Sequence, residues 1–95
     1  MERKRVVRSY RPKLSGVYLI VNLLDGRKYV GESTNIGSRW TTHLVMSTLP
    51  IQKDIREYGP SNFSFQVLEV VPKEKLKERE RYWIEYYNAE YNKKK

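Results

Sequence analysis

Three stretches of the chain carry the apolar and β-branched residues that are typical of strands. Residues 14–22 read Leu-Ser-Gly-Val-Tyr-Leu-Ile-Val-Asn, residues 27–32 alternate roughly between faces, and residues 63–71 begin with alternating Phe, Phe and Val. The first two stretches are separated by residues 23–26, which end in Asp-Gly. Because that pair supplies the positive φ angles of a tight turn, the pattern predicts a hairpin followed later by a third strand.

Other stretches repeat their apolar residues at helical spacing. Ser-Thr-Asn at 33–35 offers capping side chains before the first of them. The first helix carries Ile36, Trp40, His43, Leu44 and Ser47 on one side. Pro50 ends that helix or begins the next, over residues 51–58, and a last helix is predicted over 73–87.

The predicted order is β-β-α-α-β-α, which indicates an α/β fold with a small, three-stranded, mainly antiparallel sheet flanked by helices. We expect the third strand to lie beside the first. The domain itself is predicted over residues 14–92, with a basic N-terminal arm at 1–13 and a basic tail at 93–95.

The composition narrows the classes of protein. With 95 residues one domain is expected, and the lack of cysteine excludes disulfides and zinc–cysteine sites. The apolar runs are strand-sized, so we expect an intracellular, cytoplasmic protein without a signal peptide or membrane span. Residues 1–13 hold six basic residues against one acidic, and residues 73–95 hold eight against five. Basic ends favour a polyanion such as nucleic acid, although the last three lysines also suit an inert tail.

Five side chains carry candidate chemistry. Arg39 and His43 are four residues apart on one helix and point the same way; they suit phosphate binding and proton transfer. Glu80 lies on an apolar stripe of the last helix, where a carboxylate needs a metal ion or a salt-bridge partner. Tyr18 and Tyr29 on paired strands would place two hydroxyls side by side, or simply pack. Each residue has an ordinary structural explanation when taken alone.

Two glycines sharpen the case for a site on the strands. Gly16 and Gly31 lie inside predicted strands, where glycine marks a bulge or the close approach of another group. A phosphate backbone is one candidate for that group.

The order of these residues resembles the GIY-YIG nuclease family, which includes phage homing endonucleases, some restriction enzymes and the incision domain of bacterial excision repair. The resemblance extends from residue 15 to about residue 92. Its motifs are Gly16-Val17-Tyr18, Tyr29-Val30-Gly31, Arg39, His43, Glu80 and a late asparagine, either Asn88 or, preferably, Asn92.

The resemblance implies a divalent-metal-dependent endonuclease that hydrolyses DNA phosphodiester bonds. Glu80 would hold one Mg²⁺ or Mn²⁺ that stabilises the departing 3′ oxygen, and Arg39 would hold the scissile phosphate. Tyr18 would lie beside the attacking water, as general base or as a relay to His43, while Tyr29 would orient water or phosphate. Which of Tyr18 and His43 takes the proton is left open.

The candidate nucleic-acid contacts are Lys13, Lys28, Arg39 and Asn92. Homing endonucleases of this family carry a separate recognition domain, so this chain is either an excised domain or a small stand-alone nuclease. We expect weak sequence preference unless it forms a homodimer or joins a partner that supplies specificity. Two alternatives stay open: a non-catalytic nucleic-acid-binding module, and an RNA or single-strand nuclease on the same fold.

Overall fold

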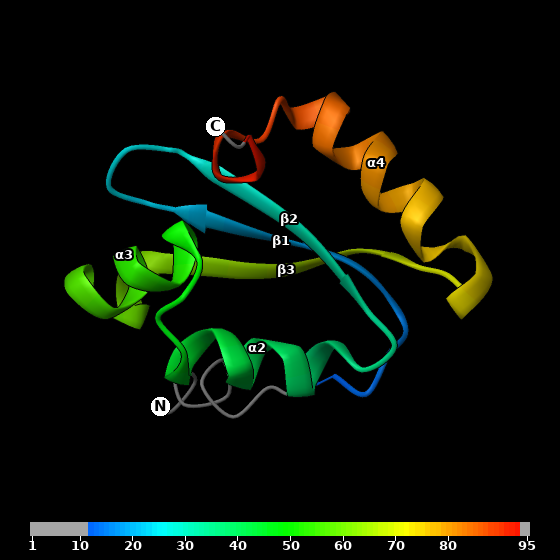
Figure 1. Ribbon diagram of the computed structural model, residues 1–95, viewed down its shortest axis with the longest axis horizontal. Helices are drawn as coiled ribbons and strands as arrows, with labels where there is room; N and C mark the ends of the chain where they lie inside the picture. The colour runs from blue at the N-terminus through cyan, green and yellow to red at the C-terminus, as the bar shows by residue number, and fades with distance from the viewer. Residues whose placement is uncertain (1–11, 94–95) are drawn as a thin grey trace, which may run out of the picture.

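The computed structural model describes residues 12–93. Along the chain these residues form β1 (Gly16–Asn22), β2 (Lys28–Ser33), α2 (Ile36–Val45), α3 (Pro50–Tyr58), β3 (Phe63–Val70) and α4 (Leu76–Tyr87), with short 3-10 turns η1 (Pro60–Asn62), η2 (Lys73–Lys75) and η3 (Glu90–Asn92). Figure 1 shows the sheet in the middle of the molecule, with α2 and α4 on opposite sides of it. The predicted element order is confirmed.

The sheet has the order β2-β1-β3, and both strand pairs are antiparallel. The hairpin between β1 and β2 turns at Gly26, whose φ is 83°. Asp25 has no positive φ, so of the predicted Asp-Gly pair the glycine alone supplies a positive angle. The β3 strand pairs with β1, as expected, so β1 is the central strand. It is buried along almost its whole length.

Each face of the sheet buries its own apolar cluster. One cluster lies under α2 and α3 and consists of Tyr18, Ile20, Ile36, Trp40, Ile51, Ile55, Phe63 and Tyr91. The other lies under α4 and consists of Val17, Leu19, Val30 and Ala89, covered by Trp83, Ile84 and Tyr87. Alternation along β1 therefore sends Tyr18 toward α2 and its neighbours Val17 and Leu19 toward α4.

The helix ends follow local chemistry. The side chain of Asn35 accepts a hydrogen bond from the backbone N–H of Ser38 and caps α2. Pro50 is the first residue of α3, which resolves the two possibilities that the sequence left open. The last helix was expected from residue 73, but residues 73–75 form the tighter turn η2 and α4 begins at Leu76.

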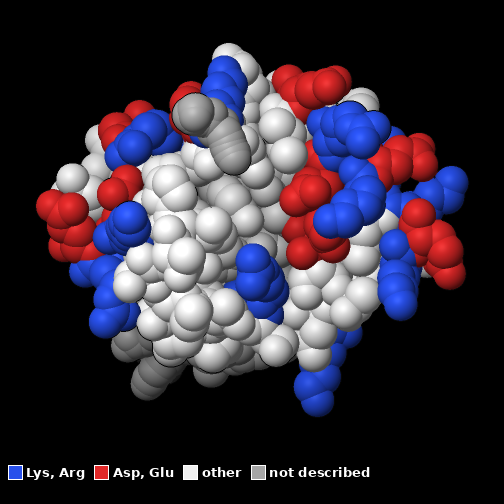
Figure 2. All heavy atoms as spheres, in the orientation of Figure 1, with Lys and Arg blue, Asp and Glu red and all other residues white. Residues whose placement is uncertain are grey.

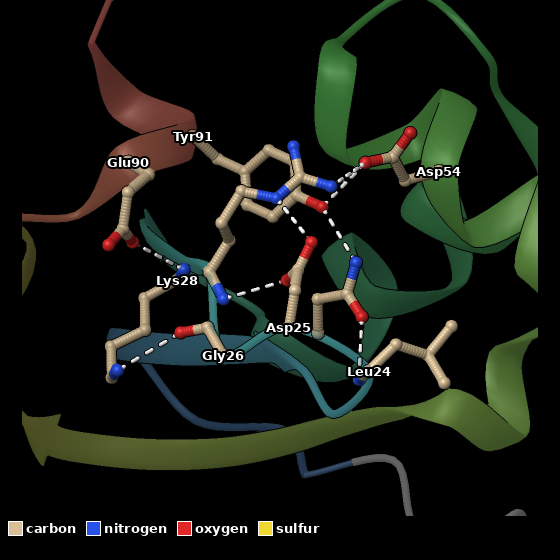
Figure 3. A network of polar contacts seen from close by, with 9 residues as sticks. Leu24, Asp25, Gly26, Lys28, Asp54, Glu90 and Tyr91 are labelled. Carbon is tan, nitrogen blue, oxygen red and sulfur yellow. Dashed lines mark hydrogen bonds and ion pairs between the residues drawn. The ribbon is translucent and has the colours of Figure 1, made fainter.

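A polar network ties the hairpin to the helices (Figure 3). The Asp54 carboxylate of α3 accepts hydrogen bonds from Arg27 at 2.8 Å and from the Tyr91 hydroxyl at 2.6 Å. Asn22, buried at the end of β1, donates to the same hydroxyl at 3.1 Å, and Arg27 also lies over the Tyr91 ring. These contacts join the end of β1, the hairpin turn, α3 and η3 at the edge of the first cluster, to which Tyr91 belongs.

The described N-terminal residues pack onto the start of α2. The Pro12 carbonyl accepts from the Gly37 N–H at 2.7 Å, and the Leu14 carbonyl accepts from the Ile36 N–H at 2.9 Å. These bonds use two N–H groups at the start of α2 that have no partner within the helix. The predicted arm and tail, apart from residues 12, 13 and 93, lie outside the described residues.

The helix lengths and the distribution of surface charge can be compared with the expectations of no membrane span and of a polyanionic partner. Within residues 12–93 no helix is both long and apolar enough to cross a membrane. On the face seen in Figure 2, most charged side chains lie toward the rims, with acidic and basic groups interspersed, and a basic side chain lies near the centre among uncharged groups. No continuous basic surface covers that face.

Candidate active site

The two tyrosines of the strand motifs meet on the face of the sheet that α2 covers. Tyr18 stands opposite Gly31 in the register of β1 and β2, and Tyr29 stands opposite Ile20. The tyrosines are therefore diagonal neighbours on one face, with ring centroids 6.3 Å apart. Tyr18 is completely buried, whereas Tyr29 is partly exposed. The expected side-by-side placement is found.

The glycines serve these strands, not a bound phosphate. A Cβ at Gly31 would lie 2.3 Å from the Tyr18 hydroxyl oxygen, and a Cβ at Gly16 would lie 2.1 Å from the Glu69 carbonyl oxygen of β3. The group that approaches each glycine is thus part of the protein. The interpretation that a phosphate backbone fills that space was wrong, because the Tyr18 ring and the β3 backbone already occupy it.

Gly31→Ala tests this close approach. The added methyl group would force the Tyr18 ring to shift; we expect a loss of about 1–3 kcal/mol in the free energy of unfolding and a large loss of any activity that depends on the Tyr18 hydroxyl. Gly26→Ala is the matched control. A side chain at its left-handed φ costs about 1–2 kcal/mol of stability, and no atom lies within 4 Å of the added Cβ. Denaturant unfolding and turnover are measured on both. Equal turnover in the two variants would contradict the assignment.

His43 projects from α2 between the tyrosines. Its Nε2 is 2.7 Å from the Tyr18 hydroxyl, and its ring centroid is 5.3 Å from that of Tyr29. On the other side, Nδ1 is 3.1 Å from Nε2 of Gln52 in α3. Burial, helped by the charge of Arg39, lowers the His43 pKa to about 4. The imidazole is therefore neutral at physiological pH.

Arg39 lies one helical turn before His43 and is half-buried. Burial raises the pKa of both tyrosines, and the positive charge and hydrogen bonding of Arg39 act in the opposite direction on each. Arg39 is thus close to both hydroxyls and favours their ionised forms. A fixed cation beside two phenols suits an anionic ligand and a phenolate.

Glu80 comes from the other side of the sheet, on α4. Its side chain is half-buried, and burial together with the nearby charge of Glu32 raises its pKa, while Lys77 lowers it. Lys77 forms its ion pair with Glu32, at 3.0 Å, and within residues 12–93 the Glu80 carboxylate has neither a hydrogen bond nor an ion pair. Its charge also raises the pKa of Tyr29, so Glu80 lies close enough to Tyr29 for the two groups to interact electrostatically.

The candidate nucleic-acid contacts, other than Arg39, are dispersed. Lys13 is exposed before β1, and the Lys28 ammonium bonds the Gly26 carbonyl in the hairpin at 3.1 Å. The Asn92 amide both donates to and accepts from the backbone of Val30, each at 2.8 Å. Asn92 therefore covers the outer edge of β2. A contact from any of these three residues to nucleic acid stays a prediction.

Two residues of the site were missed in the sequence. Gln52 sits on α3, whose short apolar pattern gave no reason to single out one glutamine. Glu32 directly follows the second strand motif, and alternation places it on the face opposite Tyr29, where α4 and Glu80 lie. That alternation was a usable signal for Glu32, whereas no local pattern pointed to Gln52.

Comparison with known proteins bears on the family and the fold. A family model described as the GIY-YIG catalytic domain matches residues 14–95. Intron-associated endonuclease 1 of Enterobacteria phage T4 is 33% identical over 86 residues, which cover 82% of this chain and 35% of that protein. The chain thus spans about a third of the length of this curated relative.

Solved structures agree with the fold. The catalytic domain of homing endonuclease I-TevI is 30% identical, with a TM-score of 0.67 over 82% of this chain and 92% of the other. The GIY-YIG N-terminal endonuclease domain of UvrC from Thermotoga maritima, solved with its catalytic divalent cation, has a TM-score of 0.67 over 97% and 94% of the two chains at 22% identity, a likeness of fold alone. The predicted three-stranded α/β fold is confirmed.

Proposed function

The chain belongs to the GIY-YIG family, and from that premise we propose that it is a divalent-metal-dependent endonuclease that hydrolyses DNA phosphodiester bonds. The observation that carries the proposal is the Glu80 carboxylate, which is half-buried, has no hydrogen bond or ion pair among residues 12–93, and raises the pKa of Tyr29 by its charge. A carboxylate held in this way costs free energy unless a ligand compensates it.

The chemistry of Glu80 fits a hard cation. Mg²⁺ and Mn²⁺ prefer oxygen ligands, and Mg²⁺ bound by one carboxylate keeps several waters and takes further ligands from phosphate. When bound, such an ion supplies Lewis-acid stabilisation of charge at the phosphate. The nearby Glu32 adds a second carboxylate beside Glu80, and the cation that pairs with Glu32 is Lys77.

The remaining side chains have distinct roles in this proposal. Arg39 binds the scissile phosphate and stabilises the charge that develops on it, as a preorganised cation does. Tyr29, which is partly exposed, places its hydroxyl beside that phosphate, and Tyr18 lies buried behind it. Arg39 makes the ionisation of both hydroxyls easier. A phenolate oxygen that accepts the proton of an attacking water would serve as general base.

The DNA substrate is proposed from the relatives, which are endonucleases. With Arg39 as the cation at the site, and without a continuous basic surface on the face of Figure 2, we propose weak sequence preference and salt-sensitive binding for this domain by itself. A homodimer or a partner that supplies specificity would extend the contact surface.

The test is metal-dependent cleavage. Supercoiled plasmid incubated with the protein and Mg²⁺ should be nicked, EDTA should abolish nicking, and Mn²⁺ should restore it. Duplex, single-stranded and RNA substrates of equal length identify the preferred class. Binding without cleavage at every metal concentration would contradict the proposal and favour a non-catalytic binding module.

A further inference from the structure

We propose that Gln52 is a positioning residue that fixes the tautomer of His43, so that the imidazole donates a hydrogen bond to Tyr18 and does not accept its proton. The catalytic meaning of this inference rests on the proposed nuclease function. The tautomer itself does not, because it follows from contacts among buried residues of the described chain.

The orientation of the Gln52 amide is fixed by two backbone N–H groups. Its Oε1 atom accepts hydrogen bonds from the backbone N–H groups of Thr48 and Leu49, each at 3.1 Å. Backbone N–H groups are donors only, so the atom that faces them must be the oxygen. A flipped amide would set its own NH₂ group against both donors. The NH₂ group of Gln52 therefore faces His43.

The NH₂ group of Gln52 determines the tautomer of the His43 imidazole. The Gln52 Nε2 atom is 3.1 Å from His43 Nδ1, and an amide NH₂ group can only donate. Nδ1 must then offer its lone pair, which leaves the ring proton of a neutral histidine on Nε2. His43 is fully buried and Gln52 is 2% exposed, so water cannot compensate for the opposite tautomer, which would set two donors against each other.

The tautomer of His43 determines which group donates the hydrogen bond between His43 and Tyr18. Nε2 is 2.7 Å from the Tyr18 hydroxyl oxygen, so the Nε2–H group donates to that oxygen. The hydroxyl proton of Tyr18 must then point away from His43. A donor at this oxygen stabilises the phenolate, in the same direction as Arg39. Proton transfer from Tyr18 to Nε2 is excluded while that nitrogen carries its own proton.

This arrangement of hydrogen bonds bears on whether Tyr18 or His43 takes the proton, which the sequence left open. Charging His43 by adding a proton at Nδ1 would place an N–H group against the Gln52 NH₂ group, and burial and the Arg39 charge oppose it as well. The imidazole stays neutral while a phenolate, formed when a tyrosine hydroxyl gives its proton to solvent, takes a proton from the attacking water. The hydroxide oxygen bonds to phosphorus, and the P–O3′ bond breaks with its electron pair on O3′, which then takes a proton from solvent. The structure thus removes His43 as general base.

The direct test uses the fact that the chain has a single histidine. Protein labelled with ring-¹⁵N histidine gives one imidazole spin system, whose two nitrogen shifts report which atom carries the proton. At neutral pH we expect a protonated Nε2 and an unprotonated Nδ1. A protonated Nδ1 in the wild-type protein would overturn the inference, whether or not the protein cuts DNA.

Gln52→Glu tests the consequence. The carboxylate still accepts from Thr48 and Leu49 but offers an acceptor to His43, so Nδ1 should become protonated and the ¹⁵N shifts should change accordingly. We expect kcat to fall on the order of 10–10²-fold with KM little changed, and the pH profile to shift. Gln66→Glu, at an exposed glutamine of β3, is the control for the added charge. It should leave kcat, KM and the pH profile unchanged.

The outcomes separate the two proposals. A Gln52→Glu protein with altered ¹⁵N shifts and wild-type kcat would show that the tautomer does not matter for catalysis and would overturn that part of the inference. If the variant does not fold, the shifts of the wild-type histidine still decide the tautomer. Absence of cleavage by the wild-type protein under every metal condition would overturn the nuclease proposal alone.

Discussion

Glu80→Ala is expected to abolish metal-dependent cleavage while nucleic-acid binding survives. Charge stabilisation by a bound metal ion is worth several kcal/mol, and about 1.4 kcal/mol corresponds to a tenfold change in rate, so the loss should be on the order of 10³-fold or more. Plasmid nicking at several Mg²⁺ concentrations measures the loss. Calorimetric titration of Mn²⁺ into wild type and variant tests whether metal affinity disappears together with activity.

Glu80→Gln separates the role of the carboxylate from its packing. Since burial and Glu32 disfavour the charged form, the neutral isostere should unfold at the same or a higher denaturant concentration than wild type at neutral pH, yet remain inactive. The pKa of Glu80 is raised in the folded protein, so this residue lowers the free energy of unfolding once the pH exceeds the pKa of Glu80 in the unfolded chain. Glu78→Ala, at an exposed position of α4, is the control. Wild-type cleavage by Glu80→Gln would contradict the assigned role.

Arg39→Ala should reduce the cleavage rate on the order of 10²–10³-fold, as expected for the loss of a preorganised cation at the transition state. Arg39 also lowers the pKa of both tyrosines, so its removal should move the rising limb of the pH–rate profile to higher pH. Single-turnover rates across the alkaline range measure both effects. Arg39→Lys keeps the charge but loses the bidentate fork, and should recover only part of the rate.

Arg56→Ala provides the matched control for that variant. Arg56 is an exposed arginine in the last turn of α3, and its removal changes net charge by the same amount. It should lower affinity for DNA no more than the loss of one distant charge predicts, with an unchanged pH profile. If Arg39→Ala and Arg56→Ala lost the same fraction of activity, the loss would be a general effect of net charge, and the specific role of Arg39 would be contradicted.

Local chemistry explains why the fold was predictable. The turn at Gly26 and the cap at Asn35 depend on residues close in sequence, and each lies where the pattern placed it. The start of α3 at Pro50 is one of the two possibilities that the pattern left open. The start of α4 was misplaced by three residues because a 3-10 turn and an α-helix draw on the same residue types, and the choice between them depends on how the segment leaves Pro72.

The site was predictable only in part. Order and spacing brought out Tyr18, Tyr29 and Arg39, and alternation fixed which way the tyrosines face. The partner of His43 was out of reach, because Gln52 meets it only when α3 packs against α2. Long-range polar contacts of this kind leave no periodic trace in the sequence.

The side chains of η3 determine how the sheet can associate with other chains. Glu90 bonds the Lys28 N–H, and Asn92 bonds both backbone groups of Val30, so two side chains two residues apart imitate a neighbouring strand along β2. An unpaired edge is a template on which a further strand can add, from the same protein or another. At these positions that template is already filled, so aggregation through β2 first requires η3 to detach.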